Sequence, residues 1–143
     1  MARQTYVFEA TLVGFRGVNR VIEVREDLTL VDLHYALQSA FGWDDDHLYA
    51  FWLDGRFWTG TDEHFTRPCA AGDSFASSAG RSAAIRLDEL GLAEGHRIAY
   101  VFDFGDEWRV RLRVQRVADD DGRPSPRLLQ SSGSAPPQYS HAA

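Results

Sequence analysis

Lysine is absent from this chain of 143 residues, so its strong bases are all arginines. Without lysine the chain cannot supply a P-loop phosphate contact, a pyridoxal Schiff base or a lysine nucleophile. A single cysteine, Cys69, is present, which excludes a disulfide within the chain and a zinc site with several thiolates from one chain. We expect Cys69 to be a free surface thiol, since no recognisable His/Asn partner motif lies near it.

Long apolar runs and a secretory signal are also missing. No apolar run reaches the roughly 18 residues that a membrane-spanning helix needs. The first residues lack the charged-then-apolar pattern of a signal peptide, and a single thiol suits a reducing compartment, so we expect a cytoplasmic protein. The formal net charge of -6 disfavours binding to nucleic acid, although a local arginine stripe is compatible with an acidic whole.

The apolar content of 44% suffices for one hydrophobic core in a chain of this length. We predict a single α+β domain over residues 1–118. Within it, residues 60–84 are predicted to form a flexible loop, because they are polar, rich in Gly, Ser and Ala, and without periodicity. Residues 119–143 are rich in Pro and Ser and are predicted to form a tail that buries little.

Local patterns predict the first elements. Alternating apolar residues favour a hairpin with strands at Thr5–Val13 and Val18–Arg25. A helix follows, because Thr29 and Asp32 form a capping-box pattern and Gly42 stands where a left-handed residue would end it. Between these ends, apolar residues recur at helical spacing: Leu30, Leu33, Leu37, Ala40 and Phe41.

A second hairpin is predicted from His47–Leu53 and Arg56–Thr59, joined by Asp54-Gly55. With a further hairpin at the end of the domain, the order of elements predicts a mixed, mostly antiparallel sheet with one principal helix packed on it. This arrangement is loosely like a β-grasp fold.

The final hairpin is predicted from Arg97–Phe104 and Glu107–Val117, joined by a two-residue turn that pairs Phe104 with Glu107. That register places one set of side chains toward the helix: Ala99, Val101, Asp103, Trp108, Val110 and Leu112. The opposite face would alternate aromatic and guanidinium groups: Ile98, Tyr100, Phe102, Arg109, Arg111 and Arg113.

Two blocks carry a family resemblance: Leu33–Leu48 (LHYALQSAFGWDDDHL) and Tyr100–Trp108 (YVFDFGDEW). In this order they resemble the Ri-plasmid ORF-three-like family, also known as insertion-element passenger "TnpR" proteins. The resemblance extends from about Thr5 to Tyr139. It implies an α+β fold and an association with mobile elements, but no established activity.

The sequence departs from that family in two places. A Pro-rich segment with Trp-Arg is Gly17–Arg20 here and keeps only the arginine, and Gln138-Tyr139 replaces the acidic residues that follow Pro-Pro. A serine recombinase would need a nucleophilic serine among arginines on a larger catalytic domain. Since the chain lacks that arrangement, we reject resolvase chemistry.

Four residues are candidates for acid-base chemistry: His34, His47, Asp103 and Asp106. Imidazole titrates near neutral pH and moves a proton in either direction, and a carboxylate can orient it. The alternative is structural: His34 would be a hydrogen-bonded core histidine, and the two aspartates would brace the turn. Asp44–Asp46 with His47 could offer ligands to a metal, but consecutive residues rarely converge on one ion, so we predict a solvated turn and no metal or cofactor.

Aromatic and arginine residues are candidates for ligand binding. The four tryptophans, Trp43, Trp52, Trp58 and Trp108, could line a pocket that residues 60–84 close, or could simply fill the core. Tyr100, Arg109 and Arg111 belong to the Arg/aromatic face, which could hold an anionic ligand or a single nucleic-acid strand. Alternatively, this face is solvated and paired with nearby acids.

Our leading hypothesis is an accessory protein that binds a small molecule or a protein partner between the helix C-terminus and the final hairpin. The rim of that pocket would hold His34, Trp43, His47, Asp103 and Trp108. The alternative is an isomerase, cyclase or hydrolase that uses an Asp/His acid-base pair in an aromatic pocket. A third hypothesis is single-stranded nucleic-acid binding on the Arg/aromatic face.

Overall fold

The computed structural model describes residues 3–44, 47–58, 64–66 and 81–136. In chain order its elements are β1 (Gln4–Leu12), β2 (Asn19–Arg25), α1 (Leu30–Phe41), β3 (Tyr49–Trp52), β4 (His64–Thr66), β5 (Arg81–Ser82), the short 3-10 helix η1 (Leu87–Glu89), β6 (Arg97–Phe102), β7 (Trp108–Asp119) and β8 (Arg127–Ser132). The strands form one sheet in the order β5-β4-β3-β6-β7-β1-β2-β8. Every neighbouring pair is antiparallel except β4 and β5.

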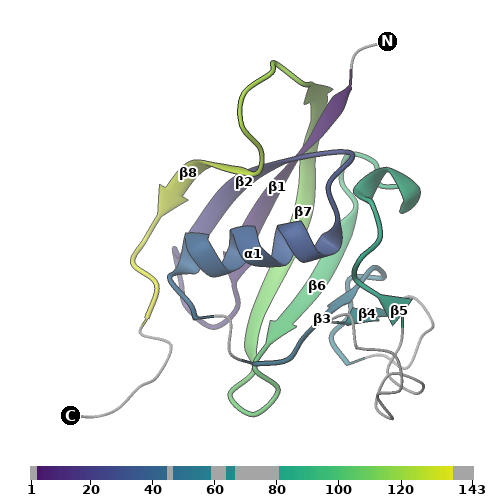
Figure 1. The fold of residues 1–143 in the computed structure, drawn as a ribbon. Coiled ribbons are helices and arrows are strands. Elements are labelled where there is room, and N and C mark those ends of the chain that lie inside the picture. Colours follow the sequence, from purple (N-terminus) through teal and green to yellow (C-terminus); the bar gives the residue numbers. More distant parts are fainter. Residues whose placement is uncertain (1–2, 45–46, 59–63, 67–80, 137–143) are drawn as a thin grey trace.

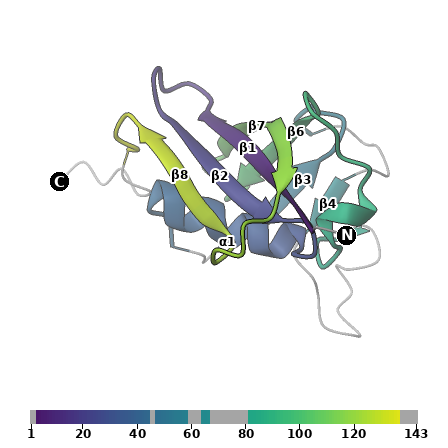
Figure 2. The same cartoon turned by 90° about the horizontal axis from the view of Figure 1, so that it is seen from above.

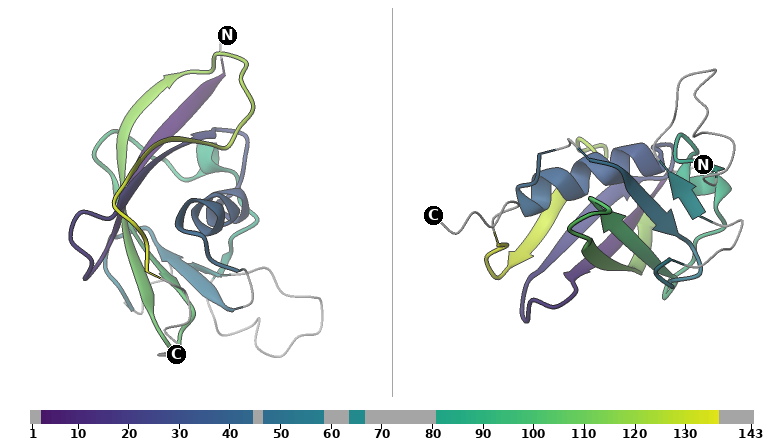
Figure 3. Two further views of the ribbon diagram at one scale, coloured as in Figure 1. Left: turned by 90° about the vertical axis from the view of Figure 1, so that its left-hand side faces the viewer. Right: turned by 90° about the horizontal axis from the view of Figure 1, so that it is seen from below.

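The helix α1 crosses one face of this sheet (Figure 1), and the sheet curves around it, as the left panel of Figure 3 shows. From above, β8 is seen to continue the sheet beyond β2 (Figure 2). The predicted α+β fold, with one principal helix on a mixed, mostly antiparallel sheet, is therefore confirmed. The longest helix in the described part of the chain has 12 residues, too few to cross a bilayer.

The predicted ends of α1 are confirmed. The Asp32 backbone N–H donates to the Thr29 side chain, and the Asp32 carboxylate accepts from the Thr29 N–H at 2.9 Å. Gly42 has φ 74°, the left-handed conformation that glycine adopts without steric cost, and its N–H donates to the Gln38 carbonyl. The helix side chains that enter the core are those at helical spacing: Leu30, Leu33, Leu37 and Phe41.

The first hairpin is also confirmed, since β1 and β2 pair antiparallel and the alternating residues Tyr6, Phe8, Ala10 and Leu12 of β1 lie in the core. Arg20 of β2 has a structural role that the alternating apolar pattern does not indicate. Arg20 is only 5% exposed, and its guanidinium donates to the Ala40 carbonyl at 2.9 Å and to the Ser132 carbonyl at 2.7 Å. Because α1 has no basic residue in its last turn, Arg20 supplies the positive charge at that end.

The sequence does not predict a strand in the 119–143 segment, yet β8 pairs antiparallel with β2 there. Glu23 and Arg127 lie opposite each other in this pairing, and the Arg127 guanidinium donates to both Glu23 carboxylate oxygens, at 2.9 and 3.2 Å. Most β8 side chains are exposed, so backbone pairing and this ion pair hold the strand more than core burial does.

The predicted register of the final hairpin is wrong by one residue: Phe102 faces Trp108 and Val101 faces Arg109. The connection spans residues 103–107, because Asp103 and Glu107 both adopt left-handed φ values, 64° and 54°, and the Glu107 N–H donates to the Asp103 carbonyl. A slip of one residue exchanges the two faces of a strand. The helix therefore covers Ile98, Tyr100 and Phe102, while Ala99 and Val101 lie on the opposite face.

The predicted pairing of His47–Leu53 with Arg56–Thr59 is also wrong. The neighbours of β3 are β4 and β6, and residues 56–58 belong to no strand; Thr59 lies outside the described residues. The Asp54 carboxylate accepts from the Arg56 N–H at 3.0 Å, and Trp58 has φ 59°, so the chain cannot stay extended. Of the predicted loop 60–84, residues 60–63 and 67–80 lie outside the described residues.

Candidate functional site

The two sequence blocks that resemble the family meet where α1 packs on β6. His34 on the helix is fully buried, and its Nδ1 lies 2.7 Å from the hydroxyl of Tyr100 on β6. The Gln38 side-chain amide donates to the same hydroxyl at 3.0 Å, and the His34 ring stacks on Tyr49 with 3.6 Å between centroids. The Tyr100 hydroxyl thus accepts from Gln38, and the direction of its hydrogen bond with His34 depends on the imidazole tautomer.

The next contact between the blocks joins two tryptophans. The rings of Trp43 and Trp108 lie 5.7 Å apart, and Trp43 also stacks on Phe41 and Phe102. Neither indole N–H has a hydrogen-bond partner among the described residues, and the same is true of Gln38 Oε1. An unpaired buried donor or acceptor costs about 1–3 kcal/mol.

The third contact joins His47 to Asp103, with 3.4 Å between Nε2 and Oδ2. The other Asp103 oxygen accepts from the backbone N–H groups of Gly105 and Asp106, at 3.1 and 3.3 Å. Asp103 therefore both braces the turn and faces an imidazole. The His47 side chain is 35% exposed, whereas that of Asp103 is 10% exposed.

The structure thus divides the four predicted acid-base residues. His34 is enclosed, and His47 and Asp103 form a pair near the surface. Asp106 is exposed, and within the described chain its carboxylate bonds to neither histidine. We name the region of these three contacts the block junction: His34, Gln38, Trp43, His47, Tyr100, Asp103 and Trp108.

Trp52 and Trp58 do not join the block junction. They form a second cluster on the opposite sheet face, with 5.1 Å between their rings, and Trp58 also contacts Phe104. The Trp58 indole donates to Glu107 at 2.8 Å, and Arg109 donates to the same carboxylate oxygen at 2.6 Å. These hydrogen bonds, that of Arg109 first, lower the pKa of Glu107.

The predicted alternation of aromatic and arginine side chains on one face is wrong. Tyr100 is fully buried beneath α1, so it cannot stack with a ligand on the arginine side. The aromatic ring beside Arg109 and Arg111 is that of Phe57, which lies 5.3 and 5.1 Å from their guanidinium carbons. The sequence could not indicate Phe57, because its place depends on the turn after β3.

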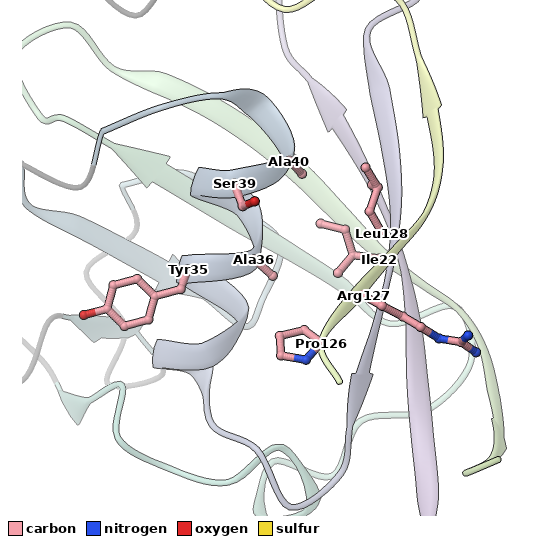
Figure 4. Close-up of a pocket in the computed structure, with 8 residues that line it drawn as sticks. All are labelled: Ile22, Tyr35, Ala36, Ser39, Ala40, Pro126, Arg127 and Leu128. Atoms are coloured by element: carbon pink, nitrogen blue, oxygen red, sulfur yellow. The ribbon is translucent and has the colours of Figure 1, made fainter. Parts of the chain in front are cut away.

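The larger cavities of the described chain lie away from the block junction. One of about 420 Å³ is on the arginine side of the sheet, between the turn after β3 and the strands β6, β7 and β1. The other, of about 250 Å³, lies between the exposed side of α1 and β8 (Figure 4). No residue predicted for the site lines the second cavity, whose walls include Ile22, Ala36, Ala40, Pro126 and Leu128.

Metal ligation finds no support in the residues that the structure describes, where no three His, Cys, Asp or Glu side chains gather around a common point. Asp45, Asp46 and Cys69 lie outside those residues.

A family model described as plasmid pRiA4b ORF-3-like protein matches residues 4–140. The chain belongs to the pRiA4b ORF-3-like family. The family named from the two blocks is thereby confirmed. The uncharacterized protein y4hQ of Sinorhizobium fredii (strain NBRC 101917 / NGR234) is 29% identical over 121 residues, which are 85% of this chain and 58% of that protein. The chain therefore spans less than two thirds of this relative's length.

A solved structure has the same fold as this member of the pRiA4b ORF-3-like family. It is the crystal structure of the protein of unknown function MM3350 from Methanosarcina mazei Go1. The TM-score is 0.78 at 23% sequence identity, covering 96% of this chain and 74% of that one. At this identity the likeness establishes the fold alone.

Proposed function

We propose that this chain is an accessory protein that binds a small molecule at the block junction. The observation that carries the proposal is the gathering of three unpartnered buried polar atoms there: Gln38 Oε1, Trp43 Nε1 and Trp108 Nε1. Each costs about 1–3 kcal/mol in a protein whose net stability is about 5–15 kcal/mol. A junction selected only for stability would hold apolar side chains instead.

The unpartnered atoms indicate the ligand's chemistry. Two indole N–H groups require acceptors, and the Gln38 oxygen requires a donor. Trp43 already stacks on Phe41 and Phe102, with 4.9 and 5.5 Å between centroids, so the ligand is held by hydrogen bonds at the indole edges rather than by stacking on Trp43. His47 marks the side of approach, because it is partly exposed and its ring lies 5.8 Å from that of Phe102.

The indole N–H resonances in a proton–nitrogen spectrum test this proposal, because the chain has four tryptophans and each gives one signal. A library of heteroaromatic carboxamides and lactams serves as the probe. We expect a binder to shift the Trp43 and Trp108 signals and leave those of Trp52 and Trp58 in place. Trp43→Phe should abolish binding, whereas Trp52→Phe should preserve it. Binders that shift only the Trp52 and Trp58 signals, or a library without binders, would overturn the proposal.

A second candidate function is acid-base catalysis by an isomerase, cyclase or hydrolase, favoured by the 3.4 Å approach of His47 to Asp103. In this function the carboxylate orients the imidazole, which exchanges a proton with the substrate at its partly exposed edge. Mass spectrometry of each binder after incubation tests it. Turnover that disappears in His47→Gln while binding persists would establish catalysis, and recovery of every binder unchanged would exclude it for those compounds.

The cellular setting belongs to the same proposal. The family resemblance supports an association with insertion elements, and the composition supports a cytoplasmic location. A transposase gene beside the coding gene supports the accessory function, whereas a biosynthetic cluster favours the enzyme.

A further inference from the structure

The sheet face away from α1 carries a charged cavity of about 420 Å³. Its charged walls are formed by Glu9, Asp54, Arg56, Arg97, Arg111 and Arg113. We name this cavity the arginine groove. It is independent of the block junction, whose buried members Trp43 and Tyr100 belong to the core on the helix side of the same sheet. Its size is within the range of small-molecule sites, which is roughly 300–1,000 Å³.

Most arginines of the groove lack a carboxylate partner among the described residues. Within the part of the chain that the structure describes, only Arg113 of the four has an ion pair, a 3.4 Å contact with Glu9. Arg56, Arg97 and Arg111 have none there, and Arg111 instead lies over the Phe57 ring. Elsewhere, arginine–carboxylate pairs with an N–O distance of 2.9 Å or less include Arg25–Asp27, Arg86–Asp88, Arg109–Glu107 and Arg127–Glu23.

The pairing of β6 with β7 brings two of these cations together. Arg97 and Arg113 are direct partners in the antiparallel ladder, where opposite Cβ atoms are about 4.5–5.5 Å apart and like charges destabilise the sheet. Arg111 is two residues before Arg113 on β7 and therefore lies on the same face. The chain has a net charge of -6, so it contains more acidic than basic side chains. The clustered arginines nevertheless lack acidic partners, which favours binding of an external anion.

We infer that the arginine groove binds a small molecule carrying a diphosphate group. A guanidinium donates two parallel hydrogen bonds to phosphate oxygens, and three guanidiniums without carboxylate partners match the charge of a diphosphate better than that of a monocarboxylate. The two carboxylates of the wall set a limit on the ligand, since Glu9 and Asp54 repel an anion placed against them. The diphosphate therefore lies toward Arg97 and Arg111.

The groove favours a small ligand over a nucleic-acid strand. A strand needs a basic track with exposed stacking rings. Of the aromatic rings on this face, Phe57 is already covered by Arg109 and Arg111, and Trp52 is buried. Trp58 is exposed, but its indole donates to Glu107, whose carboxylate repels a phosphate chain. Tyr100 and Phe102 are buried on the other face.

Titration calorimetry with inorganic pyrophosphate at low ionic strength tests the inference. We expect the dissociation constant to rise about tenfold in Arg97→Gln and in Arg111→Gln, because each removes charge-assisted hydrogen bonds to the anion. Arg86→Gln is the matched control, since it removes the same charge from a distant surface pair, and its dissociation constant should change less than about twofold. The thermal midpoint of the wild type should rise with pyrophosphate by mass action.

Folding and binding are separated by a second measurement. Without pyrophosphate, Arg97→Gln should unfold at the same urea concentration as the wild type or a higher one, because it relieves repulsion with Arg113. Absence of pyrophosphate binding by the wild type would overturn the inference, and so would equal weakening in Arg86→Gln, which indicates diffuse charge attraction. Binding of an oligothymidylate through Arg97 and Arg111 with no pyrophosphate binding would replace it with nucleic-acid recognition.

Discussion

The hydroxyl of Tyr100 lies 2.7 Å from Nδ1 of His34, and both side chains are fully buried. This contact joins α1 to β6 across the core, and Gln38 reinforces it from the next turn of the helix with a 3.0 Å hydrogen bond. A buried polar network of this kind is stabilising only while its members stay paired. The helix and the sheet are therefore held in one particular alignment.

Tyr100→Phe should lower the free energy of unfolding by about 1–3 kcal/mol, because it leaves His34 and Gln38 without the hydroxyl that both contact. Urea unfolding followed by circular dichroism measures the change. Tyr35→Phe is the matched control, since Tyr35 is on the same helix but exposed, and its effect should stay within about 0.5 kcal/mol. Equal stabilities of the two variants would contradict the role of the network.

Arg20→Met should cost about 2–3 kcal/mol of unfolding free energy. The substitution keeps an apolar stem but removes the charged donors that satisfy the Ala40 and Ser132 carbonyls. Chemical denaturation again provides the measurement, with Arg16→Met, an exposed residue of the first turn, as the control expected to be near neutral. A neutral Arg20→Met would mean that water replaces the guanidinium at no cost.

Gly133→Ala should destabilise the protein by more than Gly122→Ala. Both glycines have positive φ, 72° and 81°, so both substitutions carry the left-handed strain of about 1–2 kcal/mol. A Cβ at Gly133 would in addition collide with the backbone of Gly17, whereas nothing lies within 4 Å of one at Gly122. Comparison of the two thermal midpoints isolates the collision, and identical midpoints would rule out this packing of the segment after β8.

The ion pair of Glu107 predicts a pH-dependent stability. Hydrogen bonds from Arg109 and Trp58 lower the pKa of this carboxyl in the folded state. Its contribution to the free energy of unfolding is therefore complete above the unfolded pKa of about 4.3 and is lost as pH falls through the folded pKa. The difference in urea midpoint between the wild type and Glu107→Gln should therefore be largest near neutral pH and shrink in acid. A difference that stays constant with pH would contradict the ion pair.

The helix and the first hairpin could be predicted because their determinants are close together in the sequence. The capping box involves Thr29 and Asp32, and Gly42 ends the helix by its own conformational freedom. The strand β8 could not be predicted, because a Pro- and Ser-rich sequence gives no alternating pattern. What holds it is backbone pairing with β2 and an ion pair between residues 104 positions apart, Glu23 and Arg127.

The candidate site was predictable in part for the same reason. The two blocks name the chain segments that meet, but the register of the final hairpin depends on Asp103 and Glu107 both taking left-handed conformations. Neither is a glycine, so a two-residue turn at Gly105-Asp106 is the natural prediction. Because the predicted register was off by one residue, it placed Tyr100 on the arginine face, whereas Tyr100 lies in the core. The same error left Arg97 out of the predicted site, because its place beside Arg113 follows only from the observed register.

The pairing of β8 with β2 bears on how far the polypeptide can be shortened. A chain ended at Ala118, the predicted end of the domain, would leave the outer backbone groups of β2 open along a strand that includes Val21, Ile22 and Val24. Bare strands of this kind join neighbouring molecules edge to edge. The last segment thus covers the edge of the sheet and opposes aggregation. A shortened chain is expected to self-associate even though it keeps nearly all of the hydrophobic core.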